Sequence, residues 1–124
     1  MLTNSQKKYL FAIYILGQDG KPVKSTSVAD FLGVSKASTV KMTQRLIDEK
    51  YIIKEPYREI RLTPQGIKAA NELFTPSVIL QNFLQNKVGV SEENAREDSI
   101  TIASQVSREA LEKLVQYSLA ISAN

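Results

Sequence analysis

The sequence predicts a mainly α-helical fold that carries one small β-hairpin and is divided into two domains. Apolar residues recur at helical spacing along most of the 124 residues. Two short β-prone runs stand together within residues 51–62. The charge changes sign along the chain, since residues 1–70 hold 12 Lys and Arg against 6 Asp and Glu, and residues 71–124 hold 4 against 7. We therefore expect a basic domain over 1–70 and an acidic helical domain over 71–124.

The composition excludes several kinds of chemistry. The chain contains no cysteine and no histidine, which removes disulfides, thiolate metal sites, the most frequent general base and the most frequent transition-metal ligand. An enzyme is therefore the weakest functional class, because no lysine or carboxylate cluster is spaced to replace them. No apolar run reaches the ~18 residues of a membrane span and the N-terminus lacks a signal-peptide core, so we expect a cytoplasmic protein without a membrane partner.

The first helix is expected to begin at Thr3 or Asn4, either of which is a suitable N-cap. Gly17 and the pair Asp19-Gly20 end it. Its apolar positions are Leu10, Phe11, Ile13, Tyr14 and Leu16. This apolar surface is broad enough to be buried on more than one side.

Two further helices follow at short distance. The segment TSVADFLGV predicts a short helix with Ser25 or Thr26 as its cap and Gly33 as its stop. Ser35 is a suitable N-cap for a helix from Lys36 to about Glu49. Two helices joined by a tight turn that contains glycine are typical of a helix-turn-helix.

The second of these helices has an apolar side and a basic side. At about 100° per residue, one side carries Val40, Thr43, Leu46 and Ile47, and the opposite side carries Ser38, Lys41 and Arg45. Ala37 and Ser38 are small enough to let the backbone approach base edges. The pattern predicts a recognition helix that enters a DNA major groove. The alternative is an ordinary surface helix with solvated Lys and Arg side chains.

The β-prone runs Tyr51 to Lys54 and Glu59 to Leu62, separated by a turn that contains proline, predict a hairpin. A hairpin directly after a recognition helix makes a winged helix, and its tip would reach phosphates beside the groove. Alternatively, the hairpin only covers the edge of the core. The residues expected to contact DNA are Ser25, Thr26, Ser35, Lys36, Ala37, Ser38, Thr39, Lys41, Gln44, Arg45, Lys54, Tyr57 and Arg58.

The C-terminal part predicts four helical segments. Thr63-Pro64 begins a helix, Pro76 kinks or restarts it, and the apolar stretch that follows ends near Val88-Gly89. Ser91 and Ser107 cap the last two. This part has more apolar surface than its length needs internally, so we expect a homodimer interface formed by Phe74, Val78, Leu80, Phe83 and Leu84.

These motifs together resemble the metal-dependent repressors of the diphtheria toxin repressor type, and especially the manganese transport regulators. SQKKYLFAIYIL is similar to the family's first helix, TSVADFLGVSKASTVKMTQRL to its helix-turn-helix, YIIKEPYREIRLTPQG to its wing, and ILQNFLQNKVGVSEENAREDSITIASQVS to its dimerisation segment. The resemblance covers nearly the whole chain. It implies a homodimer, a palindromic operator and repression of transcription.

The same resemblance implies a divalent metal site whose ligands this chain lacks. The two positions of the first helix that are acidic in the family are occupied by Lys8 and Phe11. The later ligand positions are occupied by Ser77, Ile100, Ala103 and Ser104. Such a set does not suit Mn²⁺ or Fe²⁺, which take carboxylate and imidazole donors. Lys8 either mimics the metal charge or is simply solvated. The acidic residues Glu92, Glu93, Glu97 and Asp98 either bind a cation weakly or form a solvated helix face.

The predicted function is that of a sequence-specific DNA-binding regulator of transcription, a repressor that acts as a homodimer on double-stranded DNA. No metal or other cofactor is expected, and an unknown small molecule or protein takes the place of the metal as effector if the protein is regulated. The alternative is a winged-helix module for protein interaction, which forms mixed dimers with a metal-dependent relative. Asp48 and Glu49, late in the recognition helix, allow that alternative.

Overall fold

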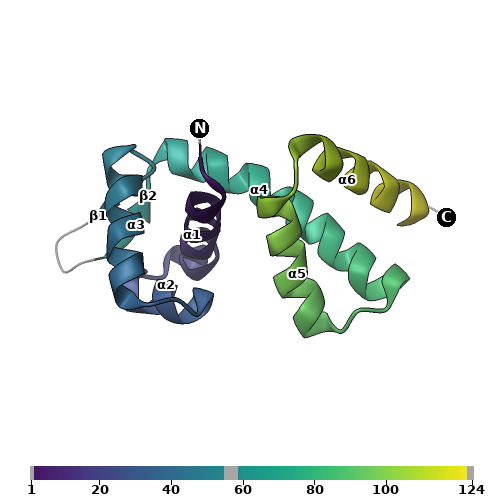
Figure 1. Cartoon of the computed structure of the whole chain (residues 1–124), viewed down its shortest axis with the longest axis horizontal. Coiled ribbons are helices and arrows are strands. Elements are labelled where there is room, and N and C mark those ends of the chain that lie inside the picture. Colours follow the sequence, from purple (N-terminus) through teal and green to yellow (C-terminus); the bar gives the residue numbers. More distant parts are fainter. Residues whose placement is uncertain (1, 55–58, 123–124) are drawn as a thin grey trace. The chain divides into compact units, whose positions relative to one another are not determined.

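The computed structural model describes residues 2–54 and 59–122, and the chain divides into two compact units, Met1–Asn71 and Glu72–Asn124. It confirms the predicted fold class, because the described residues are mostly helical and the two strands form a small antiparallel hairpin (Figure 1). The helices are α1 Asn4–Leu16, α2 Ser25–Leu32, α3 Lys36–Asp48, α4 Pro64–Phe83, α5 Glu92–Gln105 and α6 Arg108–Ser122. The strands are β1 Ile52–Lys54 and β2 Ile60–Leu62, and two short turns are η1 Gln18–Gly20 and η3 Leu84–Val88. Within the described residues, no helix combines the length and the apolar character that crossing a bilayer requires.

Helix α1 begins at a reciprocal cap. The Thr3 hydroxyl accepts a hydrogen bond from the Gln6 backbone N–H at 3.1 Å, and the Gln6 side-chain oxygen accepts one from the Thr3 N–H at 2.8 Å. The five consecutive residues from Tyr9 to Ile13 are all buried. The helix therefore packs on several sides, as the sequence predicts, and it ends at Gly17.

The turn between α2 and α3 is built as the sequence predicts. Gly33 adopts a left-handed conformation with φ of 67°, and Ser35 caps α3 by accepting a hydrogen bond from the Ser38 N–H at 3.1 Å. The prediction for the start of α2 was wrong. The N-cap is Lys24, which makes no side-chain capping bond, and Ser25 already lies inside the helix.

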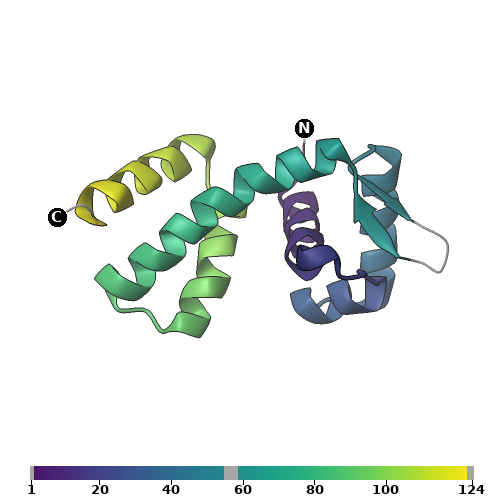
Figure 2. The ribbon, with the colours of Figure 1, turned by 180° about the vertical axis from the view of Figure 1, so that it is seen from behind.

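The hairpin pairs Ile52 with Leu62 and Lys54 with Ile60, and the views from both sides place it beside α3 (Figures 1 and 2). Val23 extends it, because the Ile60 N–H donates to the Val23 carbonyl at 2.8 Å. The backbone turn that leaves α3 is held by Thr63, whose hydroxyl donates to the carbonyl of Lys50 at 2.7 Å. The same hydroxyl accepts from the Gly66 N–H at 3.1 Å and so caps α4.

The core of the first unit joins all of its elements. Fully or almost fully buried side chains come from α1, α2, α3 and both strands, namely Leu10, Ile13, Val28, Leu46, Ile52 and Ile60. Each such side chain stabilises the fold by about 1.5–3 kcal/mol through its removal from water. The position of α3 therefore depends on packing against α1, α2 and β1.

The second unit contains the rest of α4, with α5 and α6. Helix α4 continues through Pro76, so the predicted restart does not occur. The apolar stretch ends as predicted at Gly89, which is left-handed with φ of 91° after the π-helical turn η3. Ser91 and Ser107 cap α5 and α6 by accepting from the backbone N–H groups of Asn94 and Ala110.

The interior of the second unit is made largely of small side chains. Leu73, Leu80, Ala95 and Ala103 are its buried apolar residues. The hydroxyls of Ser77, Ser99, Ser104 and Ser118 are buried with them, and each donates to a carbonyl of its own helix. Larger apolar side chains remain exposed, namely Val78, Val88, Val106, Leu114, Tyr117 and Leu119.

Candidate nucleic-acid interface

Helix α3 turns inward most of the stripe that the sequence predicts, but Thr39 takes the place expected for Val40. Thr39, Thr43 and Leu46 are at most 2% exposed, whereas Val40 is 55% exposed. Two predictions are therefore corrected: Val40 does not face the core, and Thr39 has no surface with which to contact DNA. Leu46 lies inward as expected, and Ile47 is partly buried.

The two inward threonines keep their hydroxyls satisfied within the helix. Thr39 donates to the Ser35 carbonyl at 3.0 Å, and Thr43 donates to the Thr39 carbonyl at 2.9 Å. A buried hydroxyl costs little once it has such a partner, so the methyl groups can pack against the core. The signal in the sequence was the spacing of Thr39, Thr43 and Leu46, which repeats at helical intervals.

The opposite side of α3 is exposed and carries the polar and basic residues. Those predicted DNA contacts that are exposed here are Ser35, Lys36, Ala37, Ser38, Lys41, Gln44 and Arg45. Three of them have internal partners: the Ser35 hydroxyl donates to the Ser38 hydroxyl at 2.9 Å, and the Gln44 amide donates to Asp48 at 2.9 Å. Two lysines and an arginine, Lys36, Lys41 and Arg45, are thus exposed on this helix.

The other predicted contacts lie at the start of α2 and in the wing. Thr26 is exposed, but the Ser25 hydroxyl is buried, and among the described residues it has no hydrogen-bond partner. Lys54 is exposed at the end of β1. Arg61, a second cationic residue, is exposed on the paired strand β2. Tyr57 and Arg58 lie outside the described residues.

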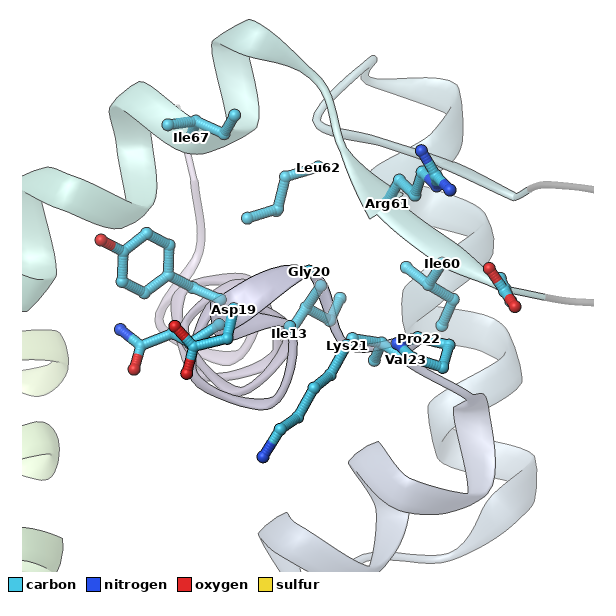
Figure 3. A pocket seen from close by; sticks show the side chains of 14 residues that line it. Ile13, Asp19, Gly20, Lys21, Pro22, Val23, Ile60, Arg61, Leu62 and Ile67 are labelled. Atoms are coloured by element: carbon cyan, nitrogen blue, oxygen red, sulfur yellow. The ribbon is translucent and has the colours of Figure 1, made fainter.

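A cavity of about 680 Å³ lies beside the wing in the first unit. Its apolar side is formed by Ile13, Leu62 and Ile67, and Asp19 and Lys21 belong to the loop at its mouth (Figure 3). Asp19 has a positive φ of 64°, which a non-glycine residue rarely adopts. No local sequence pattern indicates this cavity, because its walls come from α1, the loop after it, β2 and the first turn of α4.

The positions that correspond to metal ligands in the resembled family do not fit a divalent cation. Phe11 is buried in an apolar environment, and Ala103 offers no donor atom. The hydroxyls of Ser77 and Ser104 donate to the carbonyls of Phe74 and Ile100, at 2.7 and 2.9 Å. Across residues 2–54 and 59–122, no group of three or more Asp and Glu side chains is arranged to hold a metal ion.

The residues predicted to form a dimer interface differ in their availability. Val78 is 47% exposed, and Phe74, Phe83 and Leu84 are partly exposed. Leu80 is only 2% exposed because it packs inside its own unit, so its predicted contact with a second copy is corrected. Tyr117, which the sequence did not single out, is 59% exposed and packs edge-on against Phe83 with ring centroids 6.1 Å apart.

Known proteins with this arrangement are regulators of transcription. An HTH-type transcriptional regulator MntR from Geobacillus kaustophilus is 36% identical over 120 residues, which cover 94% of this chain and 84% of that protein. The solved structure of the manganese regulator SloR has a TM-score of 0.72 at 24% identity, over 94% of this chain and 55% of its own. A manganese-dependent transcriptional repressor in complex with manganese has a TM-score of 0.77 at 18% identity, over 91% and 52%.

This chain thus spans about half the length of those two solved chains, and the likeness to them shows the winged-helix fold with its helical continuation. Residues 1–60 match the family described as "Iron dependent repressor, N-terminal DNA binding domain". The relatives that match over most of their length are transcriptional regulators and not enzymes. The helix-turn-helix, the wing and the shared sequence lead to one conclusion: this chain belongs to the iron-dependent repressor family of DNA-binding transcriptional regulators.

Proposed function

We propose that this protein is a repressor that binds a palindromic operator as a homodimer and does not need a metal for activation. The observation that carries the proposal is the division of α3 into a buried stripe and an exposed basic face. Thr39, Thr43 and Leu46 fix the helix in its unit, so Lys41 and Arg45 are presented outward. A helix held in this way can enter a major groove and read base edges.

The proposed contacts fall into two groups. Ala37, Ser38, Lys41, Gln44 and Arg45 lie where they would face base edges, whereas Thr26, Lys36 and Lys54 lie where they would face phosphates. Phosphate contacts fix the position of the protein, and base contacts select the sequence. In a homodimer the two α3 helices would enter successive major grooves about 34 Å apart.

The homodimer is supported by the composition of the second unit. Its buried apolar residues are two leucines and two alanines, while Val78, Leu114, Tyr117 and Leu119 remain exposed. A small unit that buries few large apolar side chains and leaves several exposed gains stability when a second copy covers the exposed ones. We place the interface on α4 around Val78 and Phe83, together with Tyr117 of α6.

Metal independence is supported by the groups that stand at the ligand positions. Two of these groups are serine hydroxyls that are already bonded to their own helices, and two are apolar side chains in the interior. A Mn²⁺ ion there would find neutral hydroxyls and apolar side chains in place of the carboxylate and imidazole donors that it takes. No step of the proposed function therefore passes through a metal.

The proposed function is tested by selecting bound duplexes from genomic DNA with the purified protein and measuring affinity at several salt concentrations. We expect a palindromic consensus and an affinity that falls steeply with salt, since each phosphate contact releases counterions. Binding that is independent of salt, or the absence of any selected duplex, would favour the alternative function as a protein-interaction module.

The cavity beside β2 is the proposed place for a small-molecule effector. Its volume of about 680 Å³ lies within the range of ligand sites in proteins, about 300–1,000 Å³. A molecule bound there would contact β2, which is a strand of the wing, and the loop after α1. A screen of metabolites for changes in both melting temperature and operator affinity tests this site, and the cavity-filling substitution Ile67→Phe should abolish any such response.

A further inference from the structure

Gln6 is a polar residue that is completely buried and has both ends of its side-chain amide engaged. It is 0% exposed. Its oxygen accepts a hydrogen bond from the Thr3 N–H at 2.8 Å, and its nitrogen donates to the carboxylate of Glu49. An amide buried without partners costs about 1–3 kcal/mol, so these two bonds fix how the side chain is oriented.

The bond to Glu49 joins two elements that are far apart in sequence. Gln6 lies in the first turn of α1, and Glu49 is the residue at which α3 ends, 43 positions later. The other side-chain pairs on α3, Ser35 with Ser38 and Gln44 with Asp48, stay within that helix and its cap. The contact of Gln6 with Glu49 therefore ties the recognition helix to the rest of the unit.

Apolar packing alone does not fix the rotation of α3 about its axis or its position along that axis. Leu10 of α1 and Leu46 of α3 belong to one core cluster, and burial of apolar surface is favourable whatever its direction. A hydrogen bond depends on distance and angle, so it restrains rotation and sliding of α3 along its axis. The acceptor here is ionised, which makes the bond about twice as strong as a neutral one.

The charge of Glu49 is not explained by the stability of α3 itself. Glu49 is at the C-terminal end of the helix, where the helix dipole disfavours a negative charge. Gln6 supplies a donor for this carboxylate. The pair is therefore better explained as a link between helices than as a helix cap.

We infer that Gln6 is a positioning residue for the recognition helix, and that it acts through Glu49. It holds the end of α3 so that the exposed face with Lys41 and Arg45 keeps one orientation. This inference rests on the proposed function, because the orientation matters only where α3 reads DNA. When a binding-competent orientation is populated only in part, the apparent affinity falls by that fraction.

The test compares variants on a duplex that the wild-type protein selects from a random-sequence pool, and on an unrelated duplex. Gln6→Glu sets two carboxylates against each other, and we expect operator affinity to fall about tenfold, the equivalent of one lost bond to a charged group. Affinity for the unrelated duplex should change little, because phosphate contacts tolerate imprecise orientation. The double variant Gln6→Glu/Glu49→Gln exchanges the two side chains, so it keeps the net charge of the wild-type protein and restores one donor and one acceptor. It should recover most of the lost affinity.

Two further variants separate positioning from stability. Glu49→Ala alters an exposed residue, so the variant should fold, and we expect it to lose operator affinity. Asp30→Ala removes an exposed carboxylate from the end of α2, and we expect this control to keep its operator affinity. Ile52→Val removes one buried methylene group from the core, away from the exposed face of α3 and from the cavity, and should leave operator affinity unchanged. Denaturant unfolding of every variant gives the folded fraction under the assay conditions.

The possible failures are distinguishable. If the wild-type protein selects no duplex, the proposed function fails, and this inference fails with it. If the wild-type protein binds its operator but the double variant does not recover affinity, or if Ile52→Val loses as much affinity as Gln6→Glu, the positioning role alone is overturned.

Discussion

At the scale of single residues, Arg45 is the side chain on which sequence selection by α3 depends most in our proposal. It is exposed on the face opposite Thr39 and Thr43. We predict that Arg45→Ala weakens operator binding by about 1–3 kcal/mol, because a bidentate contact to guanine is worth that much in discrimination. A gel-shift titration against the selected operator measures the loss.

The matched control for this prediction is Arg108→Ala. Arg108 is also an exposed arginine, but it begins α6 and pairs with Glu112 at 3.2 Å in an exposed ion pair of the second unit. Its loss removes the same charge without touching α3. If Arg45→Ala weakens binding to an unrelated duplex as strongly as to the operator, Arg45 is a phosphate contact and not a reader of bases.

Residue identity alone did not determine which side of α3 faces inward. Val40 is more apolar than Thr39, so the sequence favours Val40 in the core. The structure buries Thr39 and exposes Val40, and the Ser35 carbonyl accepts the hydrogen bond of the buried Thr39 hydroxyl. Such a local partner is invisible to a count of apolar residues, so Val40 was predicted where Thr39 lies, whereas Thr43 and Leu46 were predicted correctly.

At the scale of secondary-structure elements, the start of α4 depends on a close approach that only glycine permits. A Cβ atom on Gly66 would lie 2.0 Å from the Tyr51 carbonyl oxygen. We predict that Gly66→Ala displaces α4 from the hairpin and lowers the free energy of unfolding by about 1–3 kcal/mol. Denaturant unfolding measures this change. Gln65→Ala is the control, since Gln65 is an exposed neighbour in the same turn, and an equal loss there would contradict the steric explanation.

Helix starts that are marked by a capping residue were mostly predictable from the sequence, whereas contacts between segments far apart in the chain were not. Ser35, Thr63, Ser91 and Ser107 cap helices as the sequence predicts, because a cap needs only the residues that follow it. The pairing of Val23 with Ile60 joins segments far apart in the chain and left no local signal. Pro76 indicated a kink or a restart of the helix, and the helix continues through it without a restart.

At the scale of the whole molecule, the proposed dimer makes Val78 a testable contact. Val78 is 47% exposed on α4. We predict that Val78→Glu yields a folded monomer with greatly reduced operator affinity, because a charge in a covered apolar interface is strongly unfavourable. Sedimentation equilibrium measures the mass. Gln116→Glu adds the same charge to an exposed position of α6 and should remain dimeric, and a dimeric Val78→Glu would place the interface elsewhere.

The response to metal is a second property of the whole molecule. We predict that Mn²⁺ or Fe²⁺, added to chelator-treated protein, leaves operator affinity within a factor of ten, which corresponds to about 1.4 kcal/mol. The reason is that the ligand positions hold Ser77, Ala103 and Ser104, which offer neutral hydroxyls or no donor atom in place of carboxylates and imidazoles. A matched titration with Mg²⁺ controls for general ionic effects. A larger gain with Mn²⁺ alone would show that this chain retains a metal switch.

The hydroxyl of Thr63 holds the backbone that leaves α3 and caps the start of α4. One small hydroxyl group thus holds the backbone behind the proposed DNA-binding surface without being part of that surface. The outward side chains of α3 are therefore free to diverge between related proteins, so that a new target sequence can be acquired while the scaffold stays intact.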